Sequence, residues 1–304
     1  MAADTPLKPK RRPQRPTPEQ TRRRRFAALA AIVLTIAAAA IVIVVAVPRH
    51  HHTRAVQPPA LPAPPKPFRI IFPEGFTRKQ MAERVSVVAK IAQRKRHKPV
   101  VLNGTQYLRA SQTVTVPCFR PRRQKHVEGF LFPATYDFLG KTTSRQLVGQ
   151  QLQAFCTNWA KVDFSYAHRK NLTPYDVLII ASMVEKETLA PSERPLVAAV
   201  IYNRLHQHMP LGIDATLRYG LDIKPTQSIL QSQLDSNNPY NSRKVLGLPP
   251  TPIANPGLAS IRAAAHPAKV DYLYFVRKPD KVHHFFTASD TAFAQYECAH
   301  GYGC

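Results

Sequence analysis

The chain has 304 residues, with 43 Lys or Arg against 18 Asp or Glu, and its formal net charge at pH 7 is +25. This balance is compatible with a nucleic-acid binder, but it equally suits attraction to anionic lipid headgroups or anionic wall polymers. Hydrophobic residues make up 44% of the chain, which excludes a wholly disordered protein. A dinucleotide fingerprint, a phosphate-binding loop and internal repeats are all absent from the sequence.

The N-terminal region carries the pattern of a membrane anchor. Residues 1–25 are rich in Pro and Arg, and we expect a disordered cytoplasmic tail. Phe26 to Val47 is an uncharged, mostly apolar run of 22 residues, long enough as a helix to cross a bilayer. Nine Lys or Arg residues precede the run and only three follow it before residue 68. The positive-inside rule therefore predicts one transmembrane helix over 26–48, with the rest of the chain outside the cell membrane.

A cleaved signal peptide is the alternative for this region. Its apolar stretch would span about 7–15 residues and end at a small-residue cleavage site. The sequence Ala-Val-Pro-Arg-His after Val45 matches such a site poorly. We therefore favour a retained anchor.

Residues 49–67 predict a stiff spacer between the membrane and the rest of the chain. Six prolines fall between positions 58 and 67, which favours an extended polyproline conformation. Three consecutive histidines, at positions 50–52, resemble a metal-binding tract. Without a second ligand cluster we interpret them as a solvated segment and predict no metal.

The next part of the chain has a β-α-α outline. Phe68–Phe72 alternates apolar and polar side chains as a strand does. Thr77 and Gln80 form a capping-box pattern at the start of a helix, and a second helix is expected near residues 105–111.

A largely apolar helix is predicted from residue 174 onward. Thr173 is suited to its N-cap, with Pro174 and Asp176 in the first turn. Residues 177–184 have the composition of a buried element. We therefore expect desolvation to raise the pKa of the Glu185 carboxyl near its end and to keep a proton available near neutral pH.

The helical period assigns the faces of this helix. Leu178, Ala181 and Ser182 share a face with Glu185, and the two small residues would leave room there for a ligand. Glu187 lies about 200° away around the axis and is expected to point elsewhere. A solvated glutamate at a helix end is the alternative reading of Glu185.

The remaining sequence indicates an α+β domain. Helical patterns occur near 143–158, 193–207 and 258–265, and strand patterns at 272–276 and 282–286.

Four cysteines in an exported region indicate disulfides, and four allow three pairings. We favour Cys118–Cys156, while Cys298–Cys304 would close a short loop at the tail. A zinc site would need a Cys-x₂-Cys spacing, which the sequence lacks.

Motifs in series give the chain a family resemblance over roughly residues 68–296. They are Glu128–Tyr136, Ala181–Thr188, Glu193–Pro195, Tyr202–Leu205, Asp214–Thr216, Tyr240–Asn241, Gly247–Pro250, Ala263–Pro267 and Tyr272–Val276. In order and spacing the chain resembles the YceG-like (MltG) endolytic murein transglycosylases. It departs from the family's pattern at Arg243, often an aromatic residue, and at Thr251, often a glycine.

The resemblance implies a LysM-like module at 68–116 and a catalytic domain at 117–304. It also implies an enzyme that cuts peptidoglycan glycan strands internally without water or a cofactor. The glutamate of the family's "ASxxEKE" motif, Glu185 here, would be the only catalytic acid and base. It would protonate the oxygen between N-acetylmuramic acid and N-acetylglucosamine, and then take the proton of the C6 hydroxyl as a 1,6-anhydro ring closes. Peptidoglycan synthases are possible partners, and nucleic acid is not expected.

Further polar residues of the motifs are candidates to line a substrate cleft, with structural hydrogen bonding as the open alternative. They are Glu128, Ser182, Asn203, Asp214, Tyr240 and Asn241. Asp214 could act as a second acid, but its surroundings favour hydrogen bonding. His266 is expected to be structural, and at most one of His283 and His284 can face the cleft because strand side chains alternate.

Two alternative functions stay open at this point. One is a non-catalytic peptidoglycan-binding scaffold for cell-wall synthases, although the setting of Glu185 argues against it. The other is a conventional muramidase in which Glu185 works with Asp214 as a second carboxylate.

Overall fold

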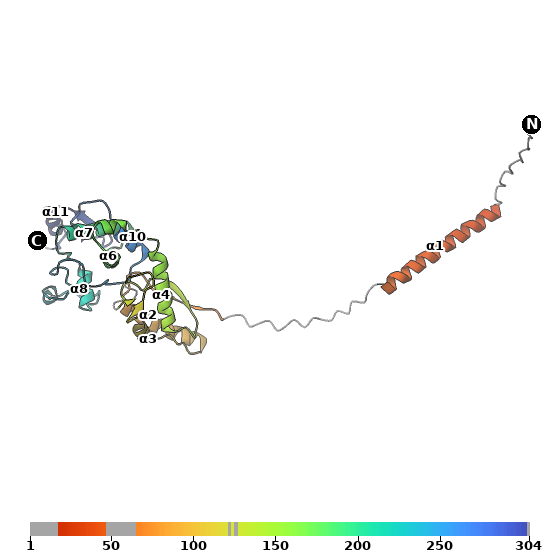
Figure 1. Cartoon of the computed structure of the whole chain (residues 1–304), viewed down its shortest axis with the longest axis horizontal. Coiled ribbons are helices and arrows are strands. Elements are labelled where there is room, and N and C mark those ends of the chain that lie inside the picture. The colour runs from red at the N-terminus through yellow and green to blue at the C-terminus, as the bar shows by residue number, and fades with distance from the viewer. Residues whose placement is uncertain (1–17, 47–64, 121–122, 125–126, 303–304) are drawn as a thin grey trace, which may run out of the picture. The chain divides into compact units, whose positions relative to one another are not determined.

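The computed structural model describes residues 18–46, 65–120, 123–124 and 127–302 (Figure 1). The chain divides into two compact units, Met1–Ala63 and Pro64–Cys304. Residues 1–17 of the predicted tail and residues 49–64 of the predicted spacer lie outside the described residues.

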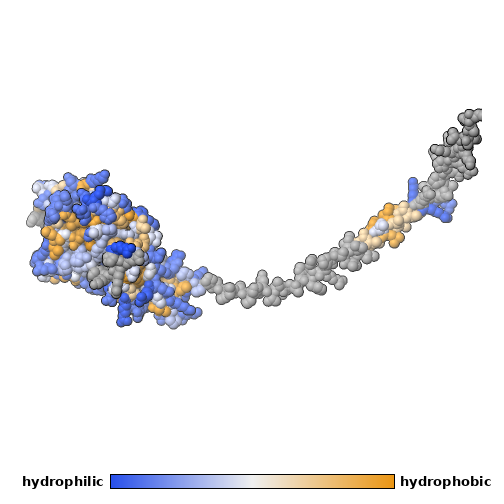
Figure 2. Space-filling view, in the orientation of Figure 1, coloured by the Kyte–Doolittle hydropathy of each residue, from blue (hydrophilic) through white to orange (hydrophobic). Residues whose placement is uncertain are grey.

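The first unit contains one helix, α1 (Pro18–Ala46), among its described residues. In Figure 2, the described part of this helix carries hydrophilic residues near its N-terminal end and a hydrophobic stretch next to them. No helix in the described parts of the chain is both long enough and apolar enough to span a membrane. The transmembrane helix at 26–48, whose last two residues are not described, is thus not supported by this finding.

The second unit is a mixed α+β structure. Within its described residues, the strands form three antiparallel pairs: β1 (Phe68–Ile71) with β4 (Thr135–Phe138), β2 (Val114–Thr115) with β3 (Arg123–Gln124), and β5 (Tyr274–Arg277) with β6 (His284–Thr287). In the first pair Ile70 lies opposite Tyr136, and both side chains are buried. The sequence predicted β1, β5 and β6 but not the other strands.

Three helices pack around the first strand pair. They are α2 (Arg78–Arg96), α3 (Gly104–Ala110) and α4 (Ser144–Trp159). The predicted capping box of Thr77 and Gln80 is present at the start of α2. The buried Tyr107 hydroxyl on α3 donates to Gln151 Oε1 on α4 over 2.7 Å. The predicted module and the segment after residue 117 therefore share one core.

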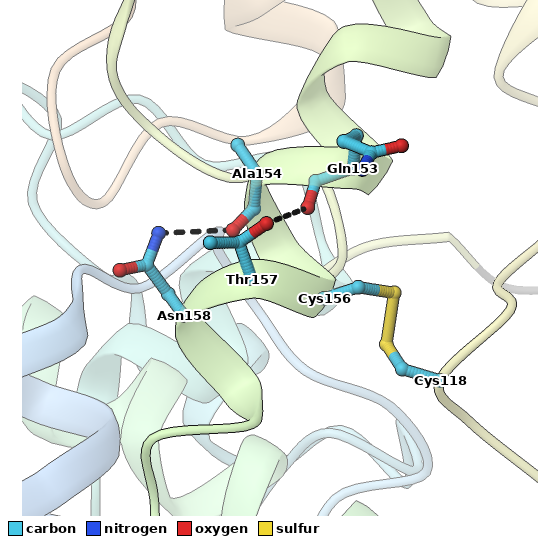
Figure 3. Close-up of a disulfide and its surroundings, with 6 residues drawn as sticks. All are labelled: Cys118, Gln153, Ala154, Cys156, Thr157 and Asn158. Atoms are coloured by element: carbon cyan, nitrogen blue, oxygen red, sulfur yellow. Dashed lines mark hydrogen bonds between the residues drawn. A yellow bond between two sulfur atoms is a disulfide. The ribbon is translucent and has the colours of Figure 1, made fainter.

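The disulfide Cys118–Cys156 joins the loop after β2 to α4, with the two Cα atoms 5.5 Å apart (Figure 3). The favoured pairing is therefore confirmed in the structure. Beside it, the ring of Phe119 packs against Phe130 and Trp159. The bridge thus anchors an aromatic cluster. Cys304 lies outside the described residues, so the Cys298–Cys304 pairing stays a prediction.

The predicted catalytic domain, residues 117–304, contains a group of helices that pack against one another. Helix α6 (Pro174–Glu187) packs against α7 (Arg194–His206) and α10 (Leu258–Ala265). The N-cap at Thr173, its capping box with Asp176 and the first-turn Pro174 are as expected. Residues 177–184 are all buried. This helix is therefore stabilised by packing around its whole circumference and not along a single apolar face.

Short elements complete the unit. They are α5 (Ser165–Arg169), η1 (Pro191–Glu193), α8 (Asp214–Gly220), α9 (Gln231–Leu234) and α11 (Asp290–Ala299). The sequence did not predict α8, and this helix supplies one wall of the candidate site.

Candidate active site

A cavity of about 980 Å³ opens beside the C-terminal end of α6. The start of α2 and residues of α8 line it, together with the segment just after α8. Glu128, Ile253 and Arg277 complete the lining. Lys79 and Asp222 form a solvent-exposed ion pair, with 2.5 Å between Nζ and Oδ2, that joins two of these walls.

Glu187, the last residue of α6, lines this cavity and is partly exposed. Burial raises the pKa of its carboxyl to about 7, the nearby Asp214 also raises it, and the Arg277 guanidinium opposes the rise. Arg277 Nη2 donates to the Glu187 carbonyl oxygen over 2.8 Å. A carboxyl with such a pKa exchanges a proton readily near neutral pH.

Glu185 occupies a different environment, although it lies only two residues earlier. Its Oε2 accepts a hydrogen bond from the backbone N–H of Gly257 over 3.0 Å. Glu185 does not belong to the lining of the cavity. Its carboxylate instead joins α6 to the start of α10.

The expected space for a ligand beside Glu185 is filled. Ala181 and Ser182 are fully buried. The Ser182 hydroxyl donates to the Ile179 carbonyl over 2.7 Å and accepts from the Ile253 N–H over 3.0 Å. The prediction of room there is wrong because the 253–257 segment and α10 pack on this face. The helical period separated the two glutamates correctly, but Glu187 is the one that points into the cavity.

Glu128 is buried at the back of the cavity and is held by three elements. Its carboxylate accepts from the Arg78 N–H at 2.9 Å, from Asn255 Nδ2 at 2.6 Å and from the Tyr219 hydroxyl at 3.3 Å. Burial raises its pKa to about 7, although these donors favour the charged form. These three donors join Glu128 to the start of α2, to Asn255 and to α8.

Asp214 begins α8 and also lines the cavity. Its Oδ1 accepts from Arg243 Nη2 over 2.7 Å and from Arg243 Nε over 2.9 Å. The residue that departs from the family's pattern, Arg243, therefore pairs with an acid whose charge raises the pKa of Glu187. Both donors of Arg243 thus bind the same oxygen of Asp214.

The other predicted cleft residues lie outside the lining of the cavity. Asn203 Nδ2 donates to the carbonyl groups of residues 270 and 272, and Asn241 Nδ2 to those of residues 234 and 236. The Tyr240 hydroxyl bonds with Thr251 Oγ1 over 2.7 Å, and Ser182 is buried as described above. The structure gives these four residues the hydrogen-bonding role that the sequence left open.

The histidines also lie away from the cavity. His284 is buried, and its Nδ1 lies 2.7 Å from Glu193 Oε2. His283 pairs with Asp280 in the turn before β6, and His266 is exposed after α10. Within the described residues, His, Cys, Asp and Glu side chains form no group of three or more that could hold a metal ion.

Sequence reasoning missed several lining residues. Arg277 projects from β5, and Lys79 and Arg218 lie at the two sides of the cavity. Tyr219, which also lines the cavity, was not singled out from the sequence either. Only the raised pKa of Glu187 and its place in the cavity, both products of tertiary packing, mark it as a candidate acid.

Known proteins are similar to this chain in sequence and in fold. The YceG-like family model matches residues 53–297. An endolytic murein transglycosylase of Bacillus subtilis (strain 168) is 37% identical over 166 residues, covering 55% of this chain and 46% of the relative. An endolytic murein transglycosylase of Streptococcus pneumoniae serotype 2 (strain D39) is 32% identical over 222 residues, covering 68% of this chain and 40% of the relative. The chain thus spans less than half the length of these curated relatives.

The fold agrees with a solved relative. A crystal structure of a putative YceG-like protein from Listeria monocytogenes has a TM-score of 0.61 to this chain and is 27% identical, and the match covers 76% of each chain. Because the family model matches well over half of the sequence, the chain belongs to the YceG-like family.

Proposed function

We propose that this protein is an endolytic murein transglycosylase that cuts peptidoglycan glycan strands and leaves 1,6-anhydro-N-acetylmuramic acid ends. Two curated relatives carry the name of this activity, and the cavity beside α6 supports it. The observation that carries the proposal is Glu187, a carboxyl with a pKa of about 7 at the wall of that cavity.

In this proposal Glu187 serves first as the acid and then as the base. Its protonated carboxyl gives a proton to the glycosidic oxygen as positive charge develops at the anomeric carbon. The resulting carboxylate takes the proton of the muramyl C6 hydroxyl, which attacks the same carbon and closes the anhydro ring. The attack is intramolecular, so it has a high effective concentration and needs no activated water.

The assignment to Glu185 that the motif suggested is the competing proposal. Two observations favour Glu187: its place in the lining of the cavity and the raised pKa of its carboxyl, which persists although the Ala215 N–H donates to it.

A muramidase with two carboxylates is a further alternative, since Asp214 lies close enough to Glu187 to raise its pKa. The pairing of Asp214 with Arg243 disfavours it as the second catalytic group. The two functions leave different ends on the glycan, so product analysis distinguishes them.

We also propose that the apolar run at 26–47 anchors the chain in the cell membrane with its N-terminus in the cytoplasm. The support is the length of the run and the excess of Lys and Arg before it. The enzyme would then act on nascent strands outside the membrane, beside the synthases that extend them. Protease added to spheroplasts should digest residues 55–304, and release of a soluble chain starting near residue 49 would contradict the anchor.

The test of the activity is product analysis by mass spectrometry. The purified full chain is incubated with uncrosslinked glycan strands, with Glu187→Gln as the control. Internal fragments with anhydro-muramyl ends support the proposal. Reducing ends would support the muramidase, and intact strands would support a scaffold without catalytic activity.

A further inference from the structure

The turn at residues 73–76, which precedes α2, is docked onto the catalytic helices. The Gly75 N–H donates to the Asn255 carbonyl over 2.9 Å, and the Asn255 N–H donates to the Phe76 carbonyl over 3.0 Å. A side chain at Gly75 would lie 3.4 Å from Glu185 Cγ. Segments distant in the sequence are therefore in direct contact beside the C-terminal end of α6.

Within this contact, the carboxylate of Glu74 rests on Gly257. A Cβ atom placed on Gly257 would lie only 1.8 Å from Glu74 Oε1 and 2.1 Å from Cδ. The φ angle of Gly257 is −76°, which any residue can adopt. The glycine is therefore needed for the space that Glu74 occupies, and not for backbone freedom.

Two carboxylates thus converge on the first turn of α10. Glu185 accepts the N–H of Gly257, the N-cap residue, and Glu74 packs against the same residue. Burial and the charge of Glu185 both raise the pKa of Glu74, while Arg194 on α7 lowers it. Lys186 Nζ lies 3.5 Å from the Gly75 carbonyl. We call the position of the Glu74 carboxylate against Gly257 its seat. Charged groups of α6 and α7 surround this seat.

The position of this turn matters because the chain continues from it into the cavity. Residues 77–80 follow directly and line the same cavity as Glu187. The N–H of Arg78 donates to Glu128 at its base. A shift of the turn would therefore move one wall of the substrate site relative to the proposed acid.

We propose that Glu74 is a positioning residue for the reaction: its carboxylate, seated on Gly257 beside Glu185, holds the wall formed by residues 77–80 in place against the substrate. Glu74 does not touch the reacting atoms in this account. The inference rests on the proposed function, because the wall is defined by the substrate that it helps to hold.

The test compares Glu74→Ala, Gly257→Ala and the double variant in the full chain. The apparent KM and kcat for anhydro-ended products are measured on uncrosslinked glycan strands, together with the Tm of each variant. Loss of the seat should raise KM about tenfold with little change in kcat, since the wall binds ground state and transition state alike. Gly257→Ala should match Glu74→Ala because its Cβ expels the flexible carboxylate, and the double variant should be no worse than either.

Two further variants make the comparison specific. Glu74→Gln has nearly the same shape and fills the same space on Gly257, so it should recover most of the lost affinity. Gly149→Ala on α4 is the matched glycine control, since a Cβ there meets nothing within 4 Å. An unchanged KM in Glu74→Ala, or additive losses in the double variant, would overturn the inference. A lower Tm with an unchanged KM would likewise reduce Glu74 to a structural residue.

The wild-type reaction separates this inference from the function on which it rests. A wild-type chain that forms no anhydro ends overturns both. A wild-type chain that forms them, together with an unchanged KM in Glu74→Ala, overturns only the role of Glu74.

Discussion

The two sides of α6 near its C-terminal end differ in what surrounds their carboxylates. On the cavity side, partial burial raises the pKa of Glu187, and the charges of Arg277 and Asp214 act on that pKa in opposite directions. On the α10 side, Glu185 bonds to a backbone N–H within a dense contact of the turn at 73–76 with the 255–257 segment. Two glutamates separated by one lysine therefore have different surroundings: in the proposal above, Glu187 exchanges protons and Glu185 joins α6 to α10.

The α10 side should contribute mainly to stability, and Asn255 is where this is largest. Its Oδ1 accepts the N–H groups of Gly129 and Leu131, both at 2.9 Å, and its Nδ2 donates to Phe76 and Glu128. Asn255→Ala would leave two buried N–H groups unpaired, so the free energy of unfolding should fall by about 3–5 kcal/mol. Denaturant unfolding measures the loss, and a change under about 1 kcal/mol would contradict the role of this contact.

A second prediction concerns a stabilising element away from both sides of α6. Removing the disulfide with Cys118→Ser and Cys156→Ser should lower the free energy of unfolding by about 2–4 kcal/mol. The KM should not change, because neither cysteine lines the cavity. Unfolding under oxidising and reducing conditions, compared with the double variant, gives the value. Four free thiols in freshly exported protein would contradict the bridge.

The cavity side should instead give a pH dependence. Burial raises the pKa of both Glu128 and Glu187 to about 7 from the ordinary value of 4.5. The folded chain therefore holds these protons more tightly than the unfolded chain, so their contribution to stability is full below about pH 4.5 and is lost as the pH rises through about 7. Glu187→Gln should flatten part of this decline in unfolding measurements between pH 5 and 8. An unchanged slope would show that the Glu187 carboxyl has an ordinary pKa.

The smallest expected effect comes from Asp214, which acts on Glu187 only through its charge. Asp214→Asn removes a negative charge that raises the pKa of Glu187, so the alkaline limb of the pH–rate profile should move to lower pH. Activity at neutral pH should fall only partially. Arg243→Gln should move the limb in the opposite direction, because it leaves the charge of Asp214 uncompensated. Movement of both variants in one direction would contradict this electrostatic account.

The sequence was sufficient where the deciding signals are local. The N-cap Thr173 with Pro174 and Asp176 predicted the start of α6, and the pattern of residues 258–265 predicted α10 at its observed bounds. The α+β class and the family followed from such elements and from motifs in series.

The side of α6 that faces the cavity could not be predicted in this way. The helical period gives the angle between Glu185 and Glu187, but the packing of the distant 253–257 segment on Ser182 decides which of them meets the cavity. The same holds for α8, whose apolar contacts are formed with elements distant in the sequence, and for the seat of Glu74 on Gly257.

The central claim is that Glu187, rather than Glu185, carries the proton. Mass spectrometry of anhydro-muramyl ends formed by Glu185→Gln and Glu187→Gln on uncrosslinked glycan strands tests it most directly. Glu187→Gln should lose about 10²-fold to 10⁴-fold in rate, because the amide can neither give nor take the proton. Glu185→Gln should retain most activity, since its amide oxygen can still accept the Gly257 N–H. The reverse result, with anhydro ends from Glu187→Gln and none from a folded Glu185→Gln, would contradict the account.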